Sequence, residues 1–153
     1  MMPIQLPTEI FQSPSSGEVR GLRVPPDSIA GIAGLLTPLL SRSTELCNGR
    51  LYPEDVFRAA QEGEMQVWLA YDQELHVLGM VVTEIVQYPA RRACLLIQCA
   101  GDALERWVHM LPDIEGWAKG RGCTLMEIQG RRGWKRRCSD YTEAHTVFEK
   151  ELT

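Results

Sequence analysis

The chain has 153 residues, of which 44% are hydrophobic and 24% charged, and its formal net charge is −4. This length suits one domain with one hydrophobic core, and the composition argues against disordered and fibrous proteins. The negative net charge makes nucleic acid an unlikely partner, and no apolar stretch reaches the ~20 residues that a membrane-spanning helix needs. The N-terminus lacks the basic and apolar regions of a signal peptide, so we expect a soluble cytoplasmic protein without a membrane partner.

Cysteine and histidine spacing argues against two further kinds of site. The five cysteines are odd in number and form no Cys-x-x-Cys pair, which disfavours a disulfide framework and a thiolate zinc site. The three histidines show no ligand spacing. We therefore expect no metal site, and most cysteines should be small buried hydrophobic residues.

Residues 1–22 are expected to form an extended N-terminal arm, followed by one domain over residues 23–153. The arm contains Pro3, Pro7 and Pro14 and a serine-rich stretch, and it has no periodicity that could bury one face. Ordering such a segment costs ~1–2 kcal/mol per residue in backbone entropy. We therefore expect the arm to be held by another subunit or a partner protein, not by its own domain alone.

Helices and strands alternate along the domain. A proline-rich start signal before Ser28 predicts a first helix, and Pro53 with two acidic residues predicts a second that ends near Gly63. Strands are predicted at Met65–Tyr71, 75–88 and 92–98, and then a helix at 103–121, which Pro112 should bend and Gly122 should end. A strand at Leu125–Ile128, a short helix at 132–138 and a closing strand at 145–152 complete the chain.

The predicted element order is therefore ααβββαβαβ. An antiparallel meander followed by a β-α-β crossover gives an α+β fold, with a mixed sheet and helices on both faces.

Five short segments carry a resemblance to a known family: YPEDV at 52–56, MQVWL at 65–69, VTEIVQYP at 82–89, WAKGRGC at 117–123 and GRRGW at 130–134. From about residue 24 to 152, the chain resembles short GNAT-like (acetyltransferase-fold) proteins encoded by bacteriophages and prophages. The resemblance implies a GNAT-like fold and a location in the bacterial host cytoplasm or in the virion. Its implied partners are other phage or virion proteins or further copies of the chain.

Acetyltransferases of this family bind the pyrophosphate of acetyl-CoA through the pattern Gln/Arg-x-x-Gly-x-Gly/Ala at a helix N-terminus. Gln98, Gly101 and Ala103 fit this pattern and are the candidate cofactor-binding residues. Asp102 and Glu105, however, place carboxylates where phosphates would sit, and they also suit helix capping. We expect no cofactor if the site is degenerate, and acetyl-CoA if the chain is an acetyltransferase.

The candidate catalytic residues are Glu84 and Tyr141. A strand glutamate, Glu84 or alternatively Glu127, could act as general base. The resemblance implies an acid as well, because active members of the family commonly use a tyrosine in the helix after their fifth strand to protonate the departing thiolate, and Tyr141 is the candidate for it here. The alternatives are a glutamate on a solvated strand face and a tyrosine that packs at the junction of helix and strand. When Asp140-Tyr141 is taken as the position of the family's Gly-Phe pair, the place of the family tyrosine falls near Arg136.

Five cations lie close together after the predicted strand at 125–128: Arg131, Arg132, Lys135, Arg136 and Arg137. This basic cluster is either a solvated helix face or a partner-binding site for phosphates, nucleic acid or an acidic protein surface, of which nucleic acid fits least. Trp134 is expected to be buried as the anchor of this helix. Core packing is also expected for Trp68, Trp107 and Trp117.

The leading hypothesis is a phage-type GNAT-fold protein with degenerate or absent acetyl transfer, acting as a binding or structural module in virion assembly or inside the virion. The alternative is an acetyl-CoA-dependent N-acetyltransferase that acts on an amine of a small molecule or protein.

Overall fold

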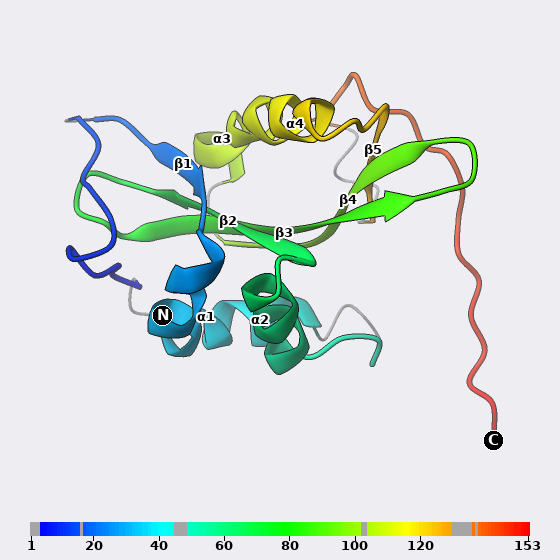
Figure 1. The fold of residues 1–153 in the computed structure, drawn as a ribbon, viewed down its shortest axis with the longest axis horizontal. Coiled ribbons are helices and arrows are strands. Elements are labelled where there is room, and N and C mark those ends of the chain that lie inside the picture. The colour runs from blue at the N-terminus through cyan, green and yellow to red at the C-terminus, as the bar shows by residue number, and fades with distance from the viewer. Residues whose placement is uncertain (1–3, 16, 45–48, 102–103, 130–135, 137) are drawn as a thin grey trace.

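A five-stranded sheet lies between two layers of helices in the computed structural model (Figure 1), which describes residues 4–15, 17–44, 49–101, 104–129, 136 and 138–153. The strands are β1 (Arg20–Arg23), β2 (Met65–Tyr71), β3 (Val77–Gln87), β4 (Arg92–Gly101) and β5 (Leu125–Ile128), and they lie in that order across the sheet. Neighbouring strands are antiparallel except β4 and β5, which are parallel. The predicted α+β class, mixed sheet and helices on both faces are confirmed. Within the ranges described, no helix is both long and apolar enough to cross a bilayer.

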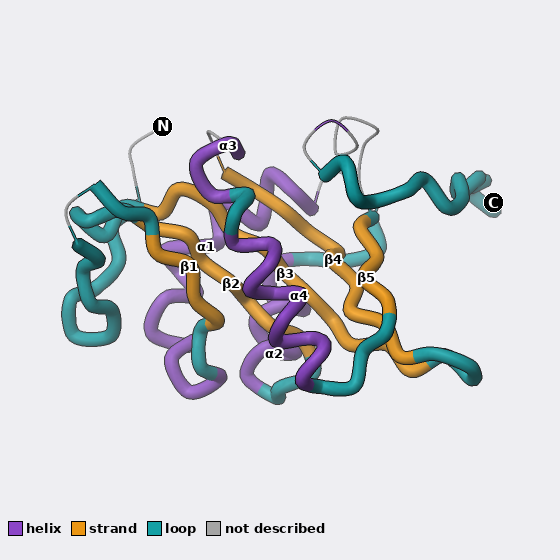
Figure 2. The backbone as a smooth tube through the Cα atoms, turned by 90° about the horizontal axis from the view of Figure 1, so that it is seen from above, coloured by secondary structure: helices purple, strands orange, loops and turns teal. Residues whose placement is uncertain are grey.

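The 3-10 helix η1 (Pro26–Ser28) and the helices α1 (Ile29–Thr44) and α2 (Pro53–Gln61) cover one face of the sheet (Figures 1 and 2). Ile32 and Leu36 of α1 and Val56 of α2 are fully buried against Val67 and Val82 of the sheet. The predicted start of α2 is confirmed. Pro53 occupies its first turn, and the Asp55 carboxylate accepts a hydrogen bond from the Tyr52 backbone N–H at 3.0 Å.

Two shorter helices, α3 (Leu104–Trp107) and α4 (Met110–Gly120), cover the opposite face. The sequence predicts one bent helix here, and the structure interrupts it at Val108 and His109. Pro112 explains the interruption, because its ring collides with the carbonyl of the residue four positions earlier, Val108. Gly122, with φ of +85°, ends α4 as predicted.

A close approach of backbone and side chain holds α3 on the sheet. A Cβ atom at Gly79 of β3 would lie 2.4 Å from the Trp107 indole, so the ring rests where only glycine leaves room. Trp107 is buried, and the predicted core packing of Trp68 and Trp107 is confirmed.

The N-terminal arm differs from the expectation. Leu6 and Phe11 are buried in the core of their own domain, and the Phe11 ring meets the Tyr71 ring edge-on, with 5.6 Å between centroids. Arg20–Arg23 forms β1 at the edge of the sheet. The expectation that the arm buries no face is therefore wrong, because its apolar side chains, although aperiodic, fill space beside β2 and α1. An additional contact of the arm with another subunit or a partner protein stays a prediction.

The predicted closing strand at 145–152 is also wrong. Residues 142–153 carry no strand and are exposed, and Phe148 is 92% exposed. The segment runs away from the domain beyond β5 (Figure 2). A strand forms only where it can pair with a neighbouring strand, and residues 142–153 pair with none. Their Glu149 carboxylate instead forms an ion pair, at 2.5 Å, with Arg50, which precedes α2.

Candidate functional site

The pairing between the parallel strands β4 and β5 ends halfway along β4. Their register runs from Ala93–Leu125 to Leu96–Ile128, after which β5 ends while β4 continues to Gly101. On the other side of β4, Val82 pairs with Gln98 but Thr83 pairs with Leu96, so Ile97 faces no partner on β3. This β-bulge turns β4 at the point where its pairing with β5 stops. The resulting edge of β4 is where the GNAT resemblance would place the cofactor.

The two described residues of the cofactor pattern both belong to β4 itself. Gln98 is 5% exposed and pairs with Val82, and Gly101 pairs with Gly79. Gly101 has φ of +133°, and a Cβ atom there would lie 2.4 Å from the Leu78 carbonyl oxygen. The glycine is thus required by its backbone conformation and by the close approach of β3. Ala103 lies outside the described residues.

The candidate base lies on the face covered by α1 and α2. Glu84 pairs with Met65 on one side and Leu95 on the other, and Leu95 pairs with Glu127. Residues in register share a face, so the two glutamates flank Leu95 across β3, β4 and β5, roughly 10 Å apart by the usual strand spacing. Glu84 and Glu127, the two alternatives for the base, are therefore brought into one row.

Tyr88, at the end of the β3–β4 hairpin, was not expected at this site. Its hydroxyl donates a hydrogen bond to the Glu127 carboxylate at 3.2 Å, and this bond raises the pKa of Tyr88. The sequence signal was the Tyr-Pro pair, which predicts the turn but not the contact. Among the described residues, Glu84 makes no such hydrogen bond or ion pair. Of the two glutamates in the row, it is therefore the one whose carboxylate is available to a substrate.

The candidate acid, Tyr141, lies on the opposite face of the sheet from Glu84. Its hydroxyl donates to the Glu115 carboxylate of α4 at 2.5 Å, and its ring packs in the cluster beneath α3 and α4. Burial, together with the hydrogen bond and negative charge of Glu115, raises the pKa of Tyr141 well above its ordinary value. The structure thus does not bring the two candidate catalytic residues together.

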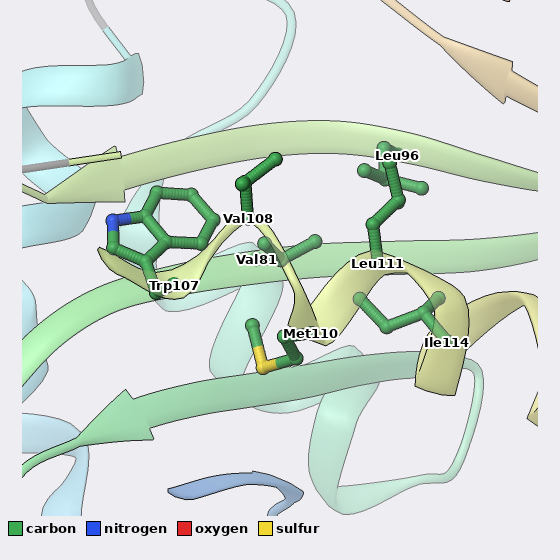
Figure 3. Close-up of a pocket in the computed structure, with 7 residues that line it drawn as sticks. All are labelled: Val81, Leu96, Trp107, Val108, Met110, Leu111 and Ile114. Atoms are coloured by element: carbon green, nitrogen blue, oxygen red, sulfur yellow. The ribbon is translucent and has the colours of Figure 1, made fainter. Parts of the chain in front are cut away.

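The space beneath α3 and α4 is filled by side chains (Figure 3). The cavity there has a volume of about 10 Å³, roughly enough for one water molecule. It is lined by Val81, Leu96, Trp107, Val108, Met110, Leu111 and Ile114. An apolar cavity of this size cannot hold an organic ligand.

Most of the basic cluster lies outside the described residues: Arg131, Arg132, Lys135 and Arg137, together with Trp134. Arg136 is described and its side chain is exposed. The partner-binding role of the cluster and the burial of Trp134 therefore remain predictions.

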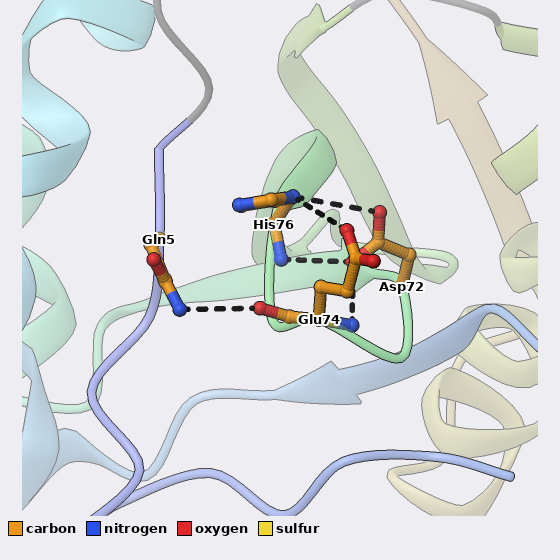
Figure 4. A network of polar contacts seen from close by, with 4 residues as sticks. All are labelled: Gln5, Asp72, Glu74 and His76. Atoms are coloured by element: carbon orange, nitrogen blue, oxygen red, sulfur yellow. Dashed lines mark hydrogen bonds and ion pairs between the residues drawn. The ribbon is translucent and has the colours of Figure 1, made fainter. Parts of the chain in front are cut away.

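A turn between β2 and β3 gathers three potential metal ligands, Asp72, Glu74 and His76 (Figure 4). Asp72 uses one carboxylate oxygen to accept hydrogen bonds from the backbone N–H groups of Glu74 and His76, at 2.9 and 3.0 Å. The His76 ring nitrogen lies 3.4 Å from the Glu74 carboxylate. Gln5 of the arm donates to the Glu74 carbonyl oxygen at 3.4 Å. These contacts give the cluster a structural role, closing the turn and fastening the arm.

Comparison with known proteins gives structural matches only. No protein-family model and no curated protein sequence matches the chain. A GNAT family acetyltransferase from Staphylococcus aureus superposes with a TM-score of 0.58 at 10% identity, covering 88% of this chain and 99% of that one. The chain has the GNAT acetyltransferase fold.

Two further matches agree with this assignment. A putative acetyl transferase from Pyrococcus furiosus gives a TM-score of 0.60 at 16% identity, covering 88% of this chain and 100% of that one. An aminoglycoside acetyltransferase from an uncultured soil metagenomic sample, in complex with sisomicin, gives 0.62 at 11% identity, covering 88% and 97%. At these identities the likeness concerns the GNAT fold alone.

Proposed function

We propose that this chain is a GNAT-fold binding protein in which acetyl transfer is degenerate or absent, and that it serves as a structural module in virion assembly or inside the virion. The phage setting rests on the resemblance of the five segments described above. The loss of acetyl transfer rests on how the fold uses the residues of the cofactor pattern.

One observation carries this proposal: the pyrophosphate pattern begins inside a strand. Binding of a pyrophosphate needs free backbone N–H groups in a loop that leads into a helix. Gln98 is buried within β4, and Gly101 is required by its contact with Leu78. The helix that follows, α3, has 4 residues in the described part of the chain, and the dipole of so short a helix is weak.

A true N-acetyltransferase is the second candidate, and the extension of β4 beyond β5 favours it. The edge of β4 after the bulge at Ile97 offers backbone groups to a bound acyl chain, and Glu84 lies on β3 beside that strand. In this candidate Glu84 would take a proton from the acceptor amine, the amine nitrogen would bond to the acetyl carbonyl carbon, and the C–S bond would break with the CoA thiolate as leaving group.

A thiol-release assay distinguishes the candidates. The full chain is incubated with acetyl-CoA and with amines of several classes, including aminoglycosides and protein N-termini, and free CoA is measured. Degenerate transfer predicts release no faster than in buffer alone. Release that depends on an amine and falls at least tenfold in Glu84→Gln, but not in the matched Glu54→Gln on α2, would establish the acetyltransferase instead.

A further inference from the structure

A hollow of about 460 Å³ opens at the other end of the sheet, away from the edge of β4 described above. It lies between the C-terminal end of α4, the start of β2 and the hairpin that joins β3 to β4. Its volume falls in the range of sites for small molecules. The side chains that decide its chemistry are Arg23, Arg92, Arg121 and Trp117, and it is also lined by Glu64 and Glu84.

The Trp117 indole orients two of these arginines. The guanidinium of Arg23 lies 5.6 Å from the ring centroid, and that of Arg121 lies 5.3 Å from it. Trp117 is in turn fixed edge-on against the buried Trp68, with 5.4 Å between centroids. Stacking uses the flat face of a guanidinium and leaves its N–H donors, which lie in the plane, available to a ligand.

Arg92, at the start of β4, supplies the second observation. Its Nε atom has less than 1 Å² exposed to solvent and has no hydrogen-bond partner among the described residues. A buried donor without an acceptor is rare in folded proteins. The neighbouring Arg91, by contrast, donates to the Thr124 hydroxyl and carbonyl oxygens at 3.3 and 2.8 Å.

None of the three arginines of the hollow forms an ion pair with a described carboxylate, although Glu64 and Glu84 belong to the same lining. Guanidinium forks that are held in place but lack an acceptor match the planar pairs of oxygens in a carboxylate or a phosphate. We propose that this hollow binds the oxyanion group of a small molecule, with Arg92 and Arg121 as its principal ligands and Trp117 as the support that orients Arg23 and Arg121. The proposal does not depend on acetyl-CoA, although Glu84, the candidate base of an acetyltransferase, belongs to the lining of the hollow.

The test is a titration of the full chain with sodium phosphate and, separately, with sodium acetate at constant ionic strength. The arginine Nε–Hε signals are followed by ¹H–¹⁵N NMR, with Arg92 assigned through Arg92→Gln. The proposal predicts a saturable shift of the Arg92 signal with at least one of the two anions. A response to phosphate alone indicates a phosphorylated ligand, a response to acetate alone a carboxylate, and a response to both an unselective oxyanion site.

Four variants make the test specific. Binding by the variants is followed through the Nε–Hε signal of Arg23, which all of them keep. Arg92→Gln and Arg121→Gln should each weaken binding at least tenfold, whereas Arg106→Gln, an equal loss of charge at an exposed residue of α3, should change it less than twofold. Arg92→Lys keeps the charge and lacks the fork, so it should also weaken binding while its melting temperature stays near that of the natural chain. No saturable shift with either anion, or equal weakening in Arg106→Gln, would overturn the proposal.

Discussion

At the scale of single residues, a glycine that the backbone requires can look like part of a functional motif. Gly101 satisfies the pyrophosphate pattern by its identity, yet its φ of +133° and the nearby Leu78 carbonyl oxygen explain it without a ligand. A left-handed or strained backbone and a close contact are both local needs of the β3–β4 pairing. Residue identity alone cannot separate these two explanations, because both select glycine.

Replacing Gly101 with alanine should destabilise the fold by roughly 2–4 kcal/mol, since the methyl group adds backbone strain and a clash. Urea unfolding measures this change. The matched control is Gly116→Ala in α4, where nothing lies within 4 Å of the new methyl group. That control should stabilise the protein by up to about 1 kcal/mol through helix propensity. An unchanged stability in Gly101→Ala would show that β4 does not close on β3 as described.

The thiol of Cys94 makes the stability of the fold depend on alkaline pH. Burial, and then the neighbouring Cys123, raise the pKa of Cys94 from 9.0 to about 11, and a hydrogen bond between Cys94 and Thr83 opposes them. The unfolded chain ionises this thiol near pH 9, while the folded chain keeps it neutral. Its contribution to stability is therefore complete below pH 9 and is lost as the pH rises towards 11.

We accordingly expect the free energy of unfolding to fall between pH 8.5 and pH 10.5 less steeply in Cys94→Ala than in the natural chain. Urea unfolding at several pH values measures both slopes, and their difference removes the contribution of the buried tyrosines. Parallel slopes would mean that Cys94 ionises at the same pH in the folded chain as in the unfolded chain.

At the scale of elements, local signals predict where helices and strands lie, and long-range packing decides what joins them. Pro53 and Gly122 bound α2 and α4 because capping is a property of a few neighbouring residues. The burial of Phe11 depends on Tyr71, which is distant in sequence, so no local pattern reveals it. The predicted closing strand is wrong for the converse reason. Residues roughly alternate in character at 145–152, as in a strand, but the segment pairs with no strand of the sheet.

The N-terminal arm should therefore behave as part of the core. Phe11→Ala removes a buried ring and should cost about 3–5 kcal/mol in urea unfolding. The control Ile10→Ala changes a neighbouring side chain that is 41% exposed, and it should cost less than about 1 kcal/mol. If both variants have equally small effects, the arm does not pack in the core and is loose, as its composition suggests.

At the scale of the whole molecule, the sequence predicts the GNAT-like layering but not the chemistry placed on it. Glu84 and Tyr141 are suitable residue types for a base and an acid, yet they lie on opposite faces of the sheet. This follows only from strand register and from the contact of Tyr141 with Glu115 of α4. The arginine-lined hollow was likewise not predicted. Trp117 lies at helical spacing within α4 and is typical of a core residue, and its stacking on Arg23 depends on β1 joining the sheet.

We propose above all that this chain has no working pyrophosphate site, because the pairing of β4 with β3 uses the residues of the pattern. Isothermal titration calorimetry with acetyl-CoA tests it most directly, because binding precedes any transfer and needs no known acceptor. We predict no binding, or binding weaker than about 1 mM, which corresponds to a binding free energy near −4 kcal/mol. A dissociation constant in the micromolar range would contradict the claim and would favour the acetyltransferase.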